Sequence, residues 1–331
     1  MYQVCREQLA THSARWGSDL LLTQGAGGNT SLKSGDTLCI KASGKRLSEA
    51  LVENIFVEMN QASLLEAITD HKEIDFNAEI AGPLRGSIET PLHAVIPAPV
   101  VVHLHSVRTL AFAIQKDGER LLEERFDGLS WAWVPYAKPG WPLTWELKKT
   151  LETSPCVWVL QNHGLIVASD SLESTHDLLC EVERRLDSKP LVSKTTPTLE
   201  LSSWVTQQTE YRLAGQAHGH NLAFCGEVLH ELTKGVVCPD QAVFLGKESA
   251  VVDSLREIPA SPSSTATVVK GHGVLLDATA GQGADDLLSC LGLLACRVPS
   301  KANFSYLSDS QIDELLNWDA EKHRQALDMR R

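Results

Sequence analysis

Two histidines separated by one residue are the first side chains in this sequence that could perform chemistry together. His103 and His105 lie in the apolar run Val-Val-Val-His-Leu-His, which predicts a buried strand over residues 100–105. Residues two apart on a strand project from the same face, with Cα atoms about 6–7 Å apart, which suits two ligands of one ion. The alternative is that both imidazoles pair with polar groups at a strand end.

A third imidazole is available in the segment Asn-His-Gly at residues 162–164. Predicted strands over residues 156–161 and 165–168 flank it, and the glycine permits a tight turn, so rigid elements would hold His163. Three neutral imidazoles with an open fourth position describe a catalytic zinc site, and Mn, Co or Ni also suit these ligands. The alternative is that His163 is only a turn residue.

Three other segments have the composition of an anion site. Residues 25–31, Gly-Ala-Gly-Gly-Asn-Thr-Ser, offer successive backbone N–H groups and small polar side chains. The Ser43-Gly44 turn has basic residues close by, and Ser87 precedes a predicted helix as its hydroxyl cap. The first segment could instead be an ordinary helix-to-strand turn, and sequence separation alone does not place the three together.

One carboxylate lies close in sequence to the two-histidine strand. Glu89 stands at the predicted start of a helix, immediately before Thr-Pro-Leu. A carboxylate at that position serves either as a general acid/base or as a structural residue stabilised by the helix dipole. Its residue type alone does not separate these two roles.

Strands and helices alternate through the first half of the chain, which predicts an α/β or α+β layer architecture. Residues 187–198, Asp-Ser-Lys-Pro-Leu-Val-Ser-Lys-Thr-Thr-Pro-Thr, are polar and without periodicity, so we interpret them as a linker. The expected domains are therefore residues 1–186 and 199–331. The tail over residues 308–331 is predicted to form an amphipathic helix.

An internal echo crosses that linker. The pattern Val-Leu-Gln-Asn-His-Gly-Leu-Ile-Val at residues 159–167 returns as Val-Val-Lys-Gly-His-Gly-Val-Leu-Leu at residues 268–276, and a predicted helix follows each copy. This favours a partial duplication, with chance similarity of two short strands as the alternative. No His-x-His strand precedes the second copy, so we predict no second catalytic metal there and assign this half a packing role.

Composition limits the classes of partner. The 331 residues carry a formal net charge of −12, which argues against broad binding of nucleic acid or an anionic membrane. The eight cysteines are scattered without a Cys-x-x-Cys pair, which is typical of reduced thiols in a cytoplasmic protein. Charged residues interrupt any signal-peptide pattern at the N-terminus, and the longest apolar run is far short of the roughly 20 residues that cross a bilayer.

Five motifs follow one another in a diagnostic order: Gly-Gly-Asn-Thr-Ser, Ser-Gly, Ser-x-Glu-Thr-Pro-Leu-His, Val-Val-His-Leu-His-Ser and Asn-His-Gly-Leu. Over residues 4–186 the chain resembles the class II aldolase/adducin family. The resemblance implies a three-layer αβα catalytic domain, followed here by a smaller C-terminal α/β domain. The segment between Glu89 and His103 is shorter than is usual for the aldolases of the family. In this respect the chain resembles a longer-chain subgroup, related to the aldolase part of rhamnulose-phosphate aldolase/dehydrogenase fusions.

The resemblance also implies roles for individual residues. It assigns a divalent metal, usually zinc, to His103, His105 and His163, and the acid/base function to Glu89. It assigns contacts with substrate phosphate to Gly28, Asn29, Ser43, Gly44 and Ser87. Ile88 stands where sugar-phosphate aldolases of the family often have a second serine, and no tyrosine here can be matched to the one those aldolases borrow from a neighbouring subunit.

The activity expected from this resemblance is that of a lyase. A metal chelating adjacent carbonyl and hydroxyl oxygens of a small ketose phosphate would stabilise the enediolate formed in retro-aldol cleavage. Decarboxylation, epimerisation or dehydration of a sugar-acid or pentulose phosphate would use the same machinery. A non-catalytic adducin-like binding protein is the competing class, but adducin-type members lack the metal histidines. The resemblance further implies a homo-oligomer, either dimer or tetramer.

Overall fold

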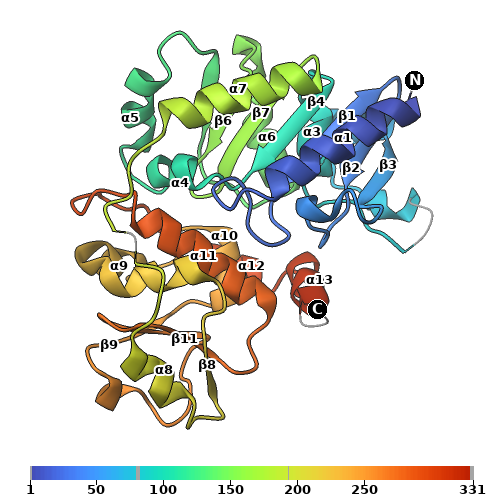
Figure 1. Ribbon diagram of the computed structural model, residues 1–331. Coiled ribbons are helices and arrows are strands. Elements are labelled where there is room, and N and C mark those ends of the chain that lie inside the picture. Colours follow the sequence, from blue (N-terminus) through green and yellow to red (C-terminus); the bar gives the residue numbers. More distant parts are fainter. Residues whose placement is uncertain (1, 80–82, 193, 329–331) are drawn as a thin grey trace. The chain divides into compact units, whose positions relative to one another are not determined.

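The computed structural model describes residues 2–79, 83–192 and 194–328, and these fold into two compact units (Figure 1). The first unit takes the described residues of Met1–Thr109 and Glu119–Asp187. The second takes those of Leu110–Gly118 and Ser188–Arg331. No helix within the described ranges is both long and apolar enough to cross a membrane.

A mixed sheet forms the centre of the first unit. Within the described residues it has seven strands in the order β3-β2-β1-β4-β7-β6-β5, and every neighbouring pair is antiparallel except β5 and β6. The strands are β1 (Asn29–Ser34), β2 (Thr37–Lys41), β3 (Phe56–Asn60), β4 (Val100–Leu104), β5 (Trp131–Val134), β6 (Val157–Leu160) and β7 (Gly164–Ser169).

Helices cover both faces of this sheet, which confirms the predicted three-layer α/β architecture (Figure 1). Helices α1 (Tyr2–Gly17) and α7 (Leu172–Arg185) pack together on one face. Helices α2 (Gln61–Thr69), α3 (Thr90–Val95) and α6 (Trp141–Lys148) cover the other, where a continuous apolar core joins them to the strands. Shorter elements are α4 (Val107–Ala113), α5 (Gly118–Arg125), η1 (Leu47–Glu49), η2 (Phe76–Glu79) and η3 (Leu151–Thr153).

Strand β4 lies in the middle of the sheet and is buried at every position. A strand covered on both faces has no solvent-facing side to carry polar residues, which is why its sequence is an apolar run rather than an alternation. The polar exception in β4 is His103, whose side chain is fully buried. The strand therefore has a reason other than packing to carry that imidazole.

The second unit is built on a smaller sheet. Its four strands within the described residues run in the order β8-β11-β10-β9, and only β9 and β10 are parallel. The strands are β8 (Tyr211–Leu213), β9 (Ala250–Val252), β10 (Ala266–Val269) and β11 (Gly273–Asp277). The helices are α8 (Leu199–Val205), η4 (Ala217–Phe224), α9 (Gly226–Thr233), α10 (Pro239–Leu245), η5 (Leu255–Glu257), α11 (Gln282–Ala295), α12 (Asp309–Leu316) and α13 (Asp319–Asp328).

The internal echo in the sequence extends to the topology of the two sheets. The order β8-β11-β10-β9 repeats β4-β7-β6-β5, with the same strand orientations. Register agrees as well, because Leu160 pairs with Gly164 in the first hairpin and Val269 pairs with Gly273 in the second. A long helix follows each hairpin, α7 in one and α11 in the other.

Several sequence-based boundaries were wrong. Strand β4 ends at Leu104, so His105 follows the strand instead of belonging to it. The segment predicted as a loop over residues 25–31 ends earlier, because Asn29–Ser34 forms β1 between β2 and β4. The polar sequence of β1 gives no strand signal. Pairing with an apolar strand on each side, β2 and β4, overrides the local propensity.

The predicted single helix over residues 308–331 is two helices, α12 and α13. Asn317 is the C-cap residue of α12, and its side-chain amide donates to the carbonyl of Asp313 at 2.9 Å. An asparagine side chain that binds nearby backbone competes with continuation of a helix. The last three residues of the predicted helix, 329–331, lie outside the described residues.

Gly164 offers a test of how tightly the first hairpin packs on β4. A Cβ at this position would lie 2.5 Å from the carbonyl oxygen of Leu104 and 3.3 Å from Cε1 of His103. We expect Gly164→Ala to lower the free energy of unfolding by about 3 kcal/mol through overpacking. Gly35→Ala is the control, since its Cβ meets nothing within 4 Å and only its φ of +57° is costly, at about 1 kcal/mol. Equal losses in chemical denaturation would contradict this packing.

Candidate metal centre

The three histidines predicted as metal ligands lie together in the first unit. One ring nitrogen of each lies within 4.8 Å of the others. The ring centroids are 5.1 Å apart for His103 and His105, 4.9 Å for His103 and His163, and 5.2 Å for His105 and His163. Their planes are steeply inclined to one another, so the rings face a common point instead of stacking.

His103 is held from both sides of β4. Its backbone lies opposite Asn29 of β1 and Ile166 of β7. Nδ1 lies 3.0 Å from the carbonyl oxygen of Leu165. A carbonyl can only accept, so Nδ1 carries the proton and Nε2 is left as the ligand atom.

His163 comes from the turn of the β6–β7 hairpin. The turn closes with a backbone hydrogen bond of 3.1 Å from His163 N–H to the carbonyl of Leu160. Asn162 adopts a left-handed conformation with φ of +56°, which asparagine tolerates better than most residues. The hairpin thus carries the third imidazole back over the end of β4.

His105 is the half-buried member of the group and lies directly after β4. The glycine-rich loop packs against its ring, because a Cβ at Gly27 would lie only 2.8 Å from His105 Nδ1. Gly28 approaches the same strand end, where a Cβ would lie 2.9 Å from the carbonyl oxygen of His103. The loop therefore has to be glycine at the points where it meets the histidines.

Glu89 lies against two of the imidazoles. Its Oε2 is 3.5 Å from His103 Nε2 and its Oε1 is 3.6 Å from His163 Nε2. Asn29 Nδ2 donates to Oε2 at 2.6 Å, whereas the buried Oε1 has no hydrogen-bond partner among the described residues. A buried carboxylate oxygen without a donor is costly unless a positive charge lies near it.

Ser87 binds the backbone of Glu89 and is not the N-cap residue that the sequence predicted. The N-cap residue of α3 is Glu89 itself, and its backbone N–H donates to Ser87 Oγ at 3.2 Å. The hydroxyl and the N–H of Thr90 both bind the carbonyl of Ser87. The predicted hydroxyl cap was wrong because the helix begins two residues later than the sequence indicates.

The donor set fits a divalent cation. Three converging imidazoles are the ligands of many catalytic zinc sites, and the hydrogen bond at Nδ1 of His103 is the outer contact that such ligands ordinarily make. The incompletely bonded carboxylate of Glu89 beside them is the group that a cation would stabilise. The geometry thus meets the requirements that the sequence suggested.

The three segments predicted to bind an anion also meet. Lys41 is fully buried at the end of β2, and its ammonium donates to the carbonyls of Ala26 at 2.8 Å and Lys45 at 2.7 Å. The Ser43-Gly44 turn is joined in turn to the segment before Ser87, through a backbone bond of 2.8 Å from Ser43 N–H to Arg85. Lys41 is one of the basic residues close to the Ser43-Gly44 turn in the sequence. A lone lysine at the end of an apolar strand is the signal that could have identified its structural role.

Asn29 behaves differently from the expectation of a phosphate contact. Its amide group is buried and donates to Glu89, so it positions the carboxylate. Gly28, Ser43, Gly44 and Ser87 stay predicted phosphate contacts. Gly28 and Gly44 both have positive φ, at +70° and +72°, a conformation found where successive backbone N–H groups form an anion-binding concavity.

Comparison with known proteins decides the family. The model of the class II aldolase and adducin N-terminal domain matches residues 7–188, which is more than half of the chain. This chain belongs to the class II aldolase/adducin family. The match covers the sheet, the histidines and Glu89 of the first unit.

Individual relatives are distant. The uncharacterized oxidoreductase YuxG of Bacillus subtilis is 24% identical over 205 residues, which cover 55% of this chain but 30% of YuxG. The N-terminal class II aldolase domain of a conserved Thermoplasma acidophilum protein is 24% identical, with a TM-score of 0.48 over 54% of this chain and 90% of that domain. A sugar-phosphate aldolase from Thermotoga maritima is 14% identical, with a TM-score of 0.43 over 56% of this chain and 93% of its own.

The second unit repeats the β4-β7-β6-β5 part of this class II aldolase/adducin domain but not its three-histidine cluster. Aligning the two hairpins at Gly164 and Gly273 places His272 where His163 lies. The sheet register then puts Leu213 in the position of His103. In the ranges that the structure describes, His103, His105 and His163 form the one group of three or more possible metal ligands.

Two histidines of the second unit, His220 and His272, have structural partners. His220 is buried, its Nδ1 accepts from Val274 N–H at 3.1 Å, and its Nε2 lies 3.1 Å from the carbonyl oxygen of Ala214. His272 Nδ1 lies 2.9 Å from the hydroxyl of Thr198. Each therefore has a local hydrogen-bonding role.

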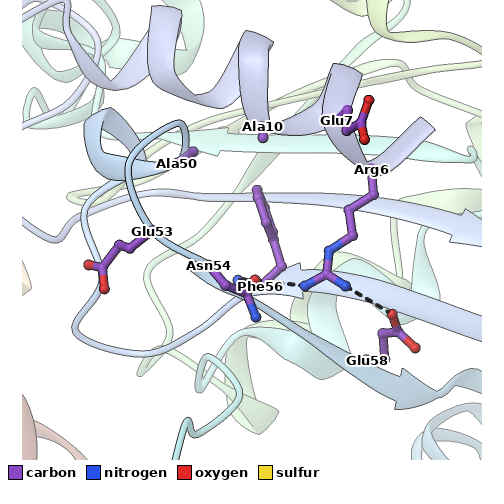
Figure 2. A pocket seen from close by; sticks show the side chains of 8 residues that line it. All are labelled: Arg6, Glu7, Ala10, Ala50, Glu53, Asn54, Phe56 and Glu58. Atoms are coloured by element: carbon purple, nitrogen blue, oxygen red, sulfur yellow. Dashed lines mark hydrogen bonds and ion pairs between the residues drawn. The ribbon is translucent and has the colours of Figure 1, made fainter. Parts of the chain in front are cut away.

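A pocket of about 480 Å³ lies elsewhere in the class II aldolase/adducin domain (Figure 2). Arg6 of α1 reaches across it to Asn54 at 2.7 Å and to Glu58 of β3 at 3.4 Å. The lining residues are Arg6, Glu7, Ala10, Ala50, Glu53, Asn54, Phe56 and Glu58. It contains none of the histidines or anion-binding segments, so it is separate from the candidate metal centre.

The internal repeat supplies a matched control for metal binding. We expect the full chain to retain one divalent ion, and His103→Ala to reduce this to about one tenth or less, since two imidazoles bind far more weakly than three. His272→Ala, at the place in the second unit that corresponds to His163, should retain the ion. Metal analysis after dialysis measures both variants. Two ions per chain, or loss of the ion in His272→Ala, would contradict the assignment.

Proposed function

We propose that this protein is a metal-dependent aldehyde-lyase that cleaves a C–C bond of a small ketose phosphate by retro-aldol chemistry. The observation that carries the proposal is the buried Glu89 carboxylate, which lies 3.5 Å and 3.6 Å from two imidazoles of a three-histidine cluster. General acid/base chemistry next to a cation site is what this cleavage requires.

His103, His105 and His163 would hold the ion, which we propose to be Zn²⁺. When bound, a divalent cation supplies Lewis-acid polarisation of the substrate carbonyl. Glu89 would move a proton on or off the carbon next to that carbonyl, and Asn29 would hold the carboxylate in place through the 2.6 Å hydrogen bond to Oε2. The other oxygen, Oε1, remains available for the proton.

The substrate phosphate would bind at the joined segments around Gly28, Ser43, Gly44 and Ser87. The buried ammonium of Lys41 links two of these segments and places a positive charge behind them. Ile88 offers no hydroxyl at a position where family aldolases often have a serine. Backbone N–H groups would therefore carry more of the recognition than side-chain hydroxyls.

Decarboxylation, epimerisation or dehydration of a related phosphate is the alternative chemistry for these residues, and a substrate panel separates them by product. We also propose a cytoplasmic homo-oligomer, dimeric or tetrameric. Cys156, Cys180, Cys225, Cys238, Cys290 and Cys296 are free thiols, in keeping with a reducing compartment.

Glu89→Gln tests the proton transfer. The amide keeps an oxygen that accepts from Asn29 but removes the titrating group, so we expect kcat to fall by about 10²–10⁴-fold with the metal retained. Release of dihydroxyacetone phosphate or an aldehyde from a panel of ketose phosphates measures kcat. A near-normal kcat would assign the proton transfer to another group.

Variants of Asn29 and Ser43 should separate orientation of the Glu89 carboxylate from binding of the substrate phosphate. Asn29→Ala removes the donor to Glu89 Oε2, so we expect kcat to fall by about tenfold or more, with a smaller change in KM. Ser43→Ala should mainly raise KM, because a phosphate contact is made equally in the ground and transition states. The reverse pattern would return Asn29 to the phosphate site and exclude Ser43 from it.

A further inference from the structure

His105 differs from the other two ligands in how its backbone is held. The β1–β4 ladder ends at His103 and the β4–β7 ladder ends at Leu104, so His105 lies just beyond the paired part of β4. His163 is fixed by a tight hairpin turn. The short junction between β4 and α4, which begins at His105, therefore contributes to the position of this ligand.

Helix α7 binds this junction through one carboxylate. Ser106, the residue after His105, donates from Oγ to Glu183 Oε1 at 2.5 Å. The same hydroxyl accepts the N–H of Thr109 at 3.2 Å and so caps the first turn of α4. Arg108 donates to the other oxygen, Glu183 Oε2, at 2.9 Å. The two carboxylate oxygens of Glu183 therefore bind Ser106 and Arg108, which lie one and three residues after His105.

Additional bonds fix the ends of this arrangement. Arg108 Nε binds Asp187 at 2.8 Å, which anchors the guanidinium to the end of α7. The N–H of Val107 binds the carbonyl of Leu21 at 2.8 Å, which holds the junction on its other side. The geometry leaves the β4–α4 junction little freedom while Glu183 is present.

Packing alone does not account for a carboxylate at this place. The side chain of Glu183 is 11% exposed, and burial raises the pKa of its carboxyl against the opposing effect of its bonds to Ser106 and Arg108. Replacing a buried ion pair by apolar residues is often neutral or stabilising. The Glu183 carboxylate binds Ser106 and Arg108, which both follow His105 in the β4–α4 junction. A role in fixing the position of this junction explains the carboxylate better than packing does.

We propose that Glu183 is a positioning residue for the metal ligand His105. It acts through Ser106 and Arg108, and it sets where the His105 imidazole lies relative to His103 and His163. The inference rests on the proposed metal centre. It adds to that centre a contact from Glu183 of α7, which lies 78 positions after His105 in the chain. Outer contacts of this kind alter metal affinity without touching the ion.

The test compares two glutamates of α7 in the full chain. Glu183→Ala should raise the dissociation constant for Co²⁺ by about tenfold and change the Co²⁺ absorption spectrum, since one imidazole is displaced. Glu181→Ala is the matched control, because Glu181 pairs only with Arg184 and Arg185 on the surface of the same helix. It should leave both the affinity and the spectrum unchanged. Competition with a chromophoric chelator measures the affinity.

Two further variants keep the outcome decisive. Glu183→Gln retains an acceptor for Ser106 and should recover part of the Co²⁺ affinity. Ser106→Ala keeps the Arg108–Glu183 pair and should weaken Co²⁺ binding. It serves as the test if Glu183→Ala does not fold. Equal Co²⁺ affinity and spectra for wild type, Ser106→Ala and the folded Glu183 variants would overturn the positioning role alone. Absence of Co²⁺ binding by the wild type would overturn the proposed metal centre and this inference with it.

Discussion

The pairing of β4 with both β1 and β7 is the constraint on which the candidate metal centre depends. It fixes the fully buried His103 opposite Asn29 on one side and Ile166 on the other. Asn29 then reaches Glu89, and the hairpin that leads into β7 carries His163. The backbone hydrogen bonds of β4 with its two neighbours thus determine most of the relative positions of the histidines and Glu89.

Energetically, the centre is organised around a carboxylate and imidazoles removed from water. Glu89 is 4% exposed, and the amide of Asn29 satisfies only one of its oxygens. A positive ion among the imidazoles would offset the cost of burying that charge, whereas the fold without the ion leaves it incompletely compensated. Ion binding and local stability should therefore be linked, as they are wherever a ligand binds the native state alone.

How far the sequence predicts such a site depends on the range of the interactions involved. The spacing of His103 and His105 and the turn around His163 are local signals, and they identified the three histidines that the fold brings together. Strand β1 was missed because its residues are mostly polar and give no strand signal; they form a strand by pairing with β2 and with β4, whose residues lie about 70 positions away. The links from Lys41 to Ala26 and from Glu183 to Ser106 join side chains to partners on other elements, which periodicity does not encode. In the second unit the local echo at His272 predicted the repeated hairpin, which the structure contains.

The central claim is that one divalent ion is bound by three imidazoles of the first unit. X-ray absorption at the zinc edge of the zinc-loaded full chain tests this most directly, because it reports the donor atoms themselves. The account predicts nitrogen or oxygen donors at about 2.0–2.1 Å, with outer-shell scattering from three imidazole rings. Sulfur donors at about 2.3 Å, or scattering from fewer than two rings, would contradict it.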